Sequence, residues 1–138
     1  MTLHAKIFRS VDGVDGLSAR QQQEHYGLYT GYVGKVNELR DKLGSIDVSH
    51  GNATYAEIRE IKIELAFALN AVKSHELFFG CLTNGGTDAD EELLAMIHRD
   101  FGSLDRLKAE MQGTVLSARG WAWLEYDRYD DGLHVYIG

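Results

Sequence analysis

Proline is absent from this chain, and cysteine occurs once, at position 81. A single cysteine excludes an intrachain disulfide and any thiolate cluster for zinc. No run of basic residues is longer than two and the formal net charge is −7, so we expect no binding to nucleic acid or to an anionic membrane. Because no apolar stretch has the length of a signal peptide or of a membrane span (about 18 residues), the expected location is cytoplasmic.

Common catalytic motifs are missing as well. The sequence contains no HExxH, CxxC, P-loop, GxSxG or GxGxxG pattern. Acyl transfer, phosphoryl transfer and dinucleotide chemistry therefore have no support.

The first strong structural signal is a helix that begins after Ser18. Ser18 and Gln21 have the spacing of a capping box, and Gly44 is the expected stop. Between them an apolar and aromatic stripe recurs at helical spacing: His25, Tyr29, Tyr32, Val36, Leu39 and Leu43. The pattern predicts that His25 faces the core.

A second helix is predicted from a capping box of Thr54 and Glu57 to about Leu82. It carries its own apolar stripe, with His75 at the edge: Ile58, Ile61, Leu65, Leu69 and Val72. It ends in the nearly uncharged stretch FALNAVKSHELFFGCL, which carries His75. Two long helices joined by a short polar loop form an antiparallel hairpin. His25 and His75 should therefore lie close together.

The chain after Gly86 has different patterns. Thr87 and Ser103 are the expected caps of two further helices, separated by Gly102, and the alternating segments WAWLEYD and LHVYI flank an Asp131-Gly132 turn. The predicted fold class is α+β: an N-terminal antiparallel long helical hairpin, then helices and an incomplete C-terminal antiparallel sheet. The expected domains are 1–84, an arm with the hairpin, and 85–138, an α/β domain truncated after its second strand.

Two histidines that face the core of one hairpin have two explanations. They are satisfied core residues, or their ring nitrogens bind a first-row transition metal. We expect Cys81 to be a buried small hydrophobe. Glu24 is expected to be a helix-dipole carboxylate.

Four segments in order, HYGLYTGYVGKVNEL, SHELFFGCL, DFGSLDRLKAE and GWAWL, resemble the iron/manganese superoxide dismutase family over nearly the whole chain. The resemblance implies a helical hairpin followed by an α/β domain, one iron or manganese ion per chain, and a homo-oligomer, either a dimer or a tetramer. It implies that His25 and His75 are metal ligands. It also implies that Tyr32 is the gateway tyrosine of a hydrogen-bond relay and that Trp121 lines the pocket, with Phe79 in the place of a common tryptophan.

The sequence departs from the family pattern in three places. His25 and Tyr32 are one residue closer than usual, so counting back from the tyrosine would put Glu24 at the first ligand position. Tyr29 stands where the family has a second histidine. The D-x-x-x-H segment with the last two ligands is absent, so two of four ligands are expected here, with weak metal binding and little turnover, unless a second chain donates the rest.

The function implied is the conversion of superoxide to dioxygen and hydrogen peroxide. The alternative is a non-catalytic interaction or oligomerisation module derived from the same fold.

Overall fold

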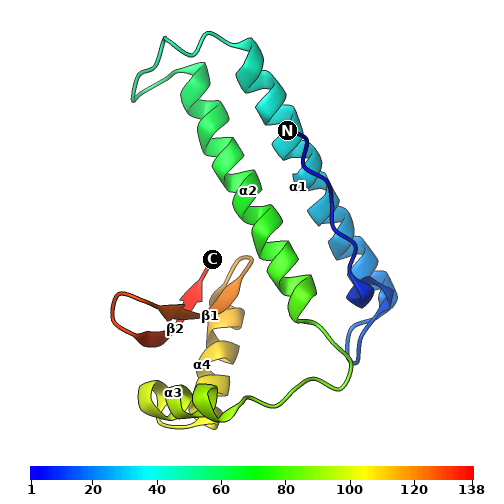
Figure 1. The fold of residues 1–138 in the computed structure, drawn as a ribbon, viewed down its shortest axis with the longest axis vertical. Coiled ribbons are helices and arrows are strands. Elements are labelled where there is room, and N and C mark those ends of the chain that lie inside the picture. The colour runs from blue at the N-terminus through cyan, green and yellow to red at the C-terminus, as the bar shows by residue number, and fades with distance from the viewer. The chain divides into compact units, whose positions relative to one another are not determined.

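A computed structural model describes residues 1–138, which form two compact units, Met1–Gly86 and Thr87–Gly138. We describe each unit by itself (Figure 1). The class is α+β, as predicted: four α-helices, one short 3-10 helix and a two-stranded antiparallel sheet.

The N-terminal unit is a helical hairpin. Its elements are η1 (Arg9–Asp12), α1 (Ala19–Ser45) and α2 (Glu57–Cys81), and the two long helices lie side by side (Figure 1). The buried side chains form one apolar core along the hairpin: Tyr29, Val33, Val36, Leu39, Ile61, Ala68, Val72 and Phe79. The hairpin and its antiparallel pairing follow from the two apolar stripes of the sequence.

An extended N-terminal arm lies against the hairpin (Figure 1). The Asn37 side chain of α1 accepts a hydrogen bond from Leu3 N–H at 2.8 Å and donates one to Leu3 C=O at 2.9 Å. One amide side chain thereby satisfies both backbone groups of one arm residue, which fixes the arm without a sheet.

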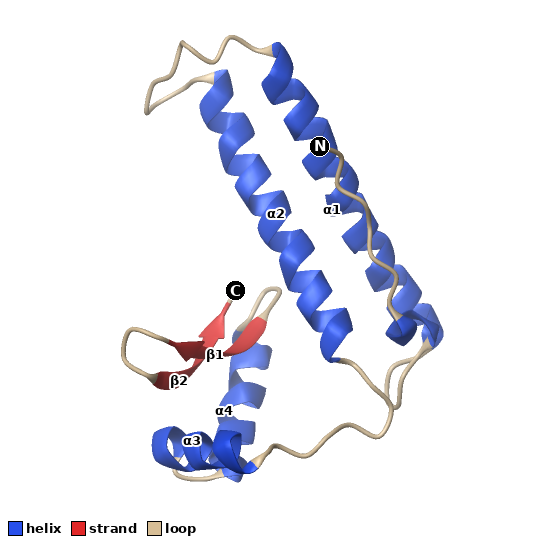
Figure 2. Ribbon diagram, viewed as in Figure 1, coloured by secondary structure: helices blue, strands red, loops and turns tan.

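The C-terminal unit packs a β-hairpin on two helices. Its elements are α3 (Glu91–Phe101), α4 (Leu104–Ser117), β1 (Ala122–Asp127) and β2 (Gly132–Ile137), shown by type in Figure 2. The register pairs Ala122 with Ile137 and Asp127 with Gly132. The core of this unit is built from Ile97, Leu107 and Leu133.

The helix caps confirm two predictions and correct two. Ser18 forms the predicted capping box with Gln21, and Ser103 caps α4. The predicted Thr54 cap is wrong, because α2 begins after Ala56, whose side chain accepts no capping hydrogen bond. The predicted Thr87 cap is also wrong: the N-cap is Asp90, whose side chain accepts from Leu93 N–H at 2.8 Å.

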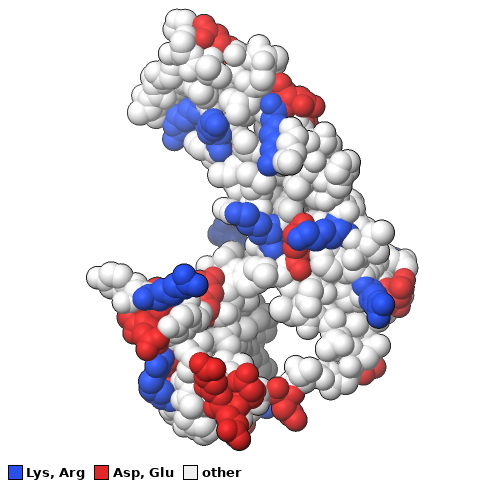
Figure 3. All heavy atoms as spheres, viewed as in Figure 1, with Lys and Arg blue, Asp and Glu red and all other residues white.

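Most of the net negative charge of the chain lies in the second unit. Residues 87–138 carry 11 Asp and Glu against 5 Lys and Arg, whereas residues 1–86 carry 10 against 9. Figure 3 shows these carboxylates gathered over the C-terminal unit on the face drawn. None of the helices is both long and apolar enough to cross a membrane.

Candidate metal centre

His25 of α1 and His75 of α2 meet inside the N-terminal unit. Their ring centres are 4.9 Å apart and the ring planes are inclined by 67°. His75 is 4% exposed, and the His25 ring also contacts Phe78 at 4.7 Å and Phe79 at 5.3 Å between ring centres. Two imidazoles that are fifty residues apart in the sequence thus lie in contact, beside the same aromatic side chains.

A backbone hydrogen bond orients the His75 ring. Nδ1 lies 2.7 Å from the carbonyl oxygen of Ala71, one turn earlier in α2. Because a carbonyl oxygen can only accept, Nδ1 carries the proton and Nε2 keeps its lone pair in the neutral imidazole. Metal-binding histidines have this arrangement, in which the second nitrogen donates to a carbonyl or a carboxylate.

The surroundings of His25 favour its neutral form. Burial, and then the nearby His75, lower the pKa of His25 below its ordinary value of 6.5. A neutral imidazole is the form that binds a metal ion, because the lone pair must be free. At neutral pH the His25 ring is therefore uncharged.

The spacing of the two rings fits a shared ion. With a metal–nitrogen distance of about 2.1 Å, two imidazoles on one ion have ring centres roughly 5 Å apart. The observed 4.9 Å is compatible with this value and is also the distance of an ordinary edge-to-face ring contact. The side chains of the chain include no group of three or more His, Cys, Asp or Glu residues arranged to hold a metal ion.

Two further aromatic residues line the histidine pair. The ring centre of Tyr32 lies 5.6 Å from that of His75, and Phe79, which is 2% exposed, lies 6.5 Å from it. Tyr32 also contacts Phe67 at 6.0 Å. Of the residues singled out in the sequence, His25, His75 and Tyr32 are thus brought together within one unit.

Trp121 belongs to the C-terminal unit. It precedes β1 and stacks on Trp123, with ring centres 5.2 Å apart. Its backbone N–H and C=O exchange hydrogen bonds with Gly138 at 3.1 and 2.9 Å, which extends the pairing of β1 and β2 by one residue pair. Its role in lining a pocket stays a prediction.

Glu24, the competing candidate for the first ligand position, has an exposed side chain. It accepts a hydrogen bond from Arg20 Nε at 2.9 Å, one turn earlier in α1. The prediction that Cys81 is buried is wrong: as the last residue of α2 it is exposed. Apolar periodicity does not distinguish the last turn of a helix from its buried interior.

A polar cluster beside the histidines was not predicted from the sequence. Tyr29 is fully buried, and its hydroxyl donates to Glu76 Oε1 at 3.0 Å and accepts from Lys6 N–H at 2.8 Å. Burial is the largest cause of the raised pKa of Tyr29. Lys6 and Glu76 are seventy residues apart, and no local pattern predicts such a pair.

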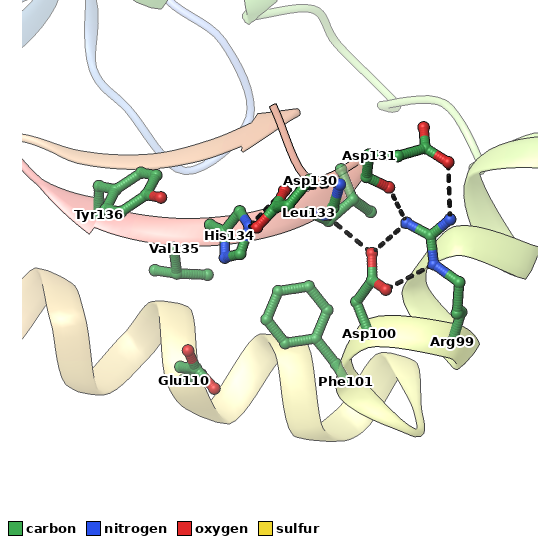
Figure 4. A pocket seen from close by; sticks show the side chains of 11 residues that line it. Arg99, Asp100, Phe101, Glu110, Asp130, Asp131, Leu133, His134, Val135 and Tyr136 are labelled. Carbon is green, nitrogen blue, oxygen red and sulfur yellow. Dashed lines mark hydrogen bonds and ion pairs between the residues drawn. The ribbon is translucent and has the colours of Figure 1, made fainter. Parts of the chain in front are cut away.

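The C-terminal unit has a groove of about 580 Å³ between β2 and the helices (Figure 4). Asp100 accepts from Arg99 and from Leu133 N–H, and Asp130 pairs with His134. Hydrogen bonding by Arg99, followed by that of Leu133, lowers the pKa of Asp100 to about 2. Asp100 holds β2 against α3, and Asp130 pairs within the hairpin, so we assign both carboxylates a structural role.

Comparison with known proteins identifies the family of this chain. Residues 89–137 match the family model described as iron/manganese superoxide dismutases, C-terminal domain. The chain is 39% identical to the protein named superoxide dismutase [Fe] of Aquifex pyrophilus, over 96% of this chain and 65% of that protein. This chain belongs to the iron/manganese superoxide dismutase family.

The chain is also similar to other superoxide dismutases, some named with iron and some with manganese. Superoxide dismutase [Fe] of Aquifex aeolicus is 38% identical over 88% of the chain and 60% of its own length. Superoxide dismutase [Mn] 2, mitochondrial, of Caenorhabditis elegans is 31% identical over 83% of this chain and 52% of its own length. The chain spans about three fifths of the length of the two Aquifex superoxide dismutases.

Proposed function

We propose that this chain acts in superoxide disproportionation, with His25 and His75 as two ligands of an iron or manganese ion. The observation that supports the proposal best is the pair of imidazoles 4.9 Å apart, with His75 Nδ1 bonded to a backbone carbonyl. When bound, the metal would supply one-electron redox chemistry that oxidises one superoxide to dioxygen and reduces another to hydrogen peroxide. We prefer His25 to Glu24 as ligand because Glu24 pairs with Arg20.

The protein residues would orient and enclose the ion. The Ala71 carbonyl fixes the tautomer of His75, and Phe78 and Phe79 limit access of water to the His25 ring. We assign the gateway role to Tyr32, whose ring lies against His75, and the lining role to Trp121. The relay would supply protons through the Tyr32 hydroxyl.

Superoxide turnover tests this function. We expect the chain with Mn²⁺ to consume superoxide faster than the same concentration of Mn²⁺ alone, although slowly, because two imidazoles are a small ligand set. His75→Ala should remove the excess rate, whereas His98→Ala, on the exposed face of α3, should keep it. A rate equal to that of the free ion would contradict the proposal.

The second candidate function is a non-catalytic interaction module, and the surface of α2 favours it. Phe67 and Leu77 are 60% and 59% exposed, and a contiguous exposed apolar patch on this helix would be a surface that another protein covers. A homo-oligomer, dimer or tetramer, is compatible with either function. A biological role that survives both His25→Ala and His75→Ala would favour the module over the enzyme.

A further inference from the structure

The N-terminal arm is bound to the hairpin through all three polar groups of Lys6. Its N–H donates to the Tyr29 hydroxyl at 2.8 Å, and its C=O accepts from the Tyr26 hydroxyl at 2.8 Å. Its ammonium pairs with Glu76 Oε2. Two residues of α1 and one of α2 therefore hold a single arm residue.

The Tyr29 hydroxyl lies at the centre of this cluster. It accepts from the arm and donates to Glu76 Oε1 at 3.0 Å, so it joins the arm, α1 and α2. Tyr29 is 0% exposed, and its ring centre is 6.3 Å from that of His75. The bond is one turn from His25 along α1 and one residue from His75 along α2.

Most of the remaining contact between the two helices is apolar. Apolar packing is non-directional, so it does not by itself define one hydrogen-bonded position of one helix against the other. A buried hydrogen bond has a defined length and angle and fixes the register of the elements that it joins. The side chains that pack between the helices include Val33, Val36, Leu39, Ile61, Ala68 and Val72.

The arm also closes the end of this cluster. Phe8 contacts the ring of Tyr29 at 6.0 Å and that of Phe79 at 5.5 Å. Phe79 in turn contacts His25. Through Phe8, the arm therefore packs against both Tyr29 and an aromatic neighbour of the histidine pair.

We propose that Tyr29 is a positioning residue, whose hydrogen bond to Glu76, supported by Lys6 of the arm, sets the position of His75 relative to His25. The inference rests on the proposed function in one respect, the use of the two histidines as metal ligands. Supporting hydrogen bonds around metal ligands typically change metal affinity 10- to 100-fold when they are removed.

The test is a Co²⁺ titration of the full chain, followed by the visible absorption of the bound ion. Tyr29→Phe keeps the ring and removes only the hydroxyl, and we expect Co²⁺ to bind roughly 10- to 100-fold more weakly. Tyr126→Phe is the matched control, since it removes a phenol–carboxylate hydrogen bond to Asp131 in the C-terminal unit. The control should bind Co²⁺ as the parent chain does.

A second measurement needs no metal. In the parent chain and in Tyr126→Phe, we expect a nuclear Overhauser effect between the ring protons of His25 and His75. In Tyr29→Phe this effect should weaken and the ring signals should shift, while circular dichroism shows that both helices are retained. A change in ring geometry without loss of helix separates positioning from general destabilisation.

The outcomes separate the inference from the proposed function. If the parent chain binds Co²⁺ and Tyr29→Phe binds it equally well, the positioning role is overturned and the metal role stands. If the parent chain binds no Co²⁺, the metal role fails, and the ring signals decide the positioning role. Unchanged signals in Tyr29→Phe overturn it, and altered signals support it.

Discussion

At the scale of single residues, His25 is the group whose protonation most depends on its surroundings. Burial and the neighbouring His75 lower its pKa below 6.5. Between pH 6.5 and the lower pKa of the folded state, the folded chain binds fewer protons than the unfolded chain. The free energy of unfolding therefore has its full contribution from His25 above pH 6.5. This contribution is lost as the pH falls from 6.5 through the lower pKa of the folded state.

An NMR titration of the imidazole protons measures this shift. We expect His25 to titrate below pH 6.5 in the parent chain. In His75→Ala its pKa should rise, because the charge repulsion between the rings disappears. A His25 pKa at or above 6.5 that is unaffected by His75→Ala would contradict the described packing of the two rings.

The sequence predicted the histidine pair because each ring lies on a stripe with helical spacing and the hairpin brings the two stripes together. It could not predict Tyr29–Glu76–Lys6, because side-chain pairing across seventy residues leaves no periodic signal. Gln22 was missed for a similar reason: it is a polar residue with 2% exposure on the buried face of α1. Its amide oxygen has no hydrogen-bond partner among the protein groups.

At the scale of elements, the two long helices begin differently. Ser18 accepts from Gln21 N–H at 3.3 Å, and Gln21 Oε1 accepts from Ser18 N–H at 3.2 Å. The first turn of α2 has no such side-chain cap, since its N-cap is Ala56. The first N–H groups of a helix have no backbone acceptor within the helix. In α1 the Ser18 side chain accepts from one of them, so the stability of this helix end should depend on Ser18.

Ser18→Ala tests the cap. We expect a loss of about 1 kcal/mol in the free energy of unfolding, because one helix N–H loses its acceptor. Chemical denaturation followed by circular dichroism measures it, and Ser18→Asp, which keeps an acceptor, should restore most of the stability. Equal stability of Ser18→Ala and the parent chain would show that the cap contributes nothing.

The β-hairpin of the C-terminal unit depends on Asp100. The Arg99 and Leu133 hydrogen bonds lower its pKa to about 2, compared with 3.8 for an ordinary Asp. Its contribution to stability is thus present above pH 3.8 and is lost as the pH falls toward 2.

Asp100→Asn should remove this part of the acid sensitivity. We expect the parent chain to be more stable than the variant at pH 5, and the difference to shrink as the pH approaches 2. Denaturation followed by the fluorescence of Trp121 and Trp123 reports on this unit. The control is Asp88→Asn, which changes an exposed carboxylate before α3. A stability difference between the parent chain and Asp100→Asn that stays the same from pH 5 to pH 2 would contradict the role of Asp100.

At the scale of the whole molecule, the two units differ in charge and in chemistry. The hairpin unit is nearly neutral and holds the histidine pair, whereas the C-terminal unit carries an excess of six acidic side chains. Composition gives the net charge of −7, but only the structure assigns it to units (Figure 3). Local caps were predictable only in part, since Ser18 and Ser103 are caps whereas Thr54 and Thr87 have the correct spacing but lie outside the helix ends.

The most direct test of a metal held between His25 and His75 is a Mn²⁺ titration, with the free ion measured by electron paramagnetic resonance. We predict saturable binding of one ion per chain, weakened at least tenfold in both His25→Ala and His75→Ala. The control His98→Ala should bind as the parent chain does. Binding that is absent, or that persists without the two histidines, would contradict the account and leave the imidazoles as core residues.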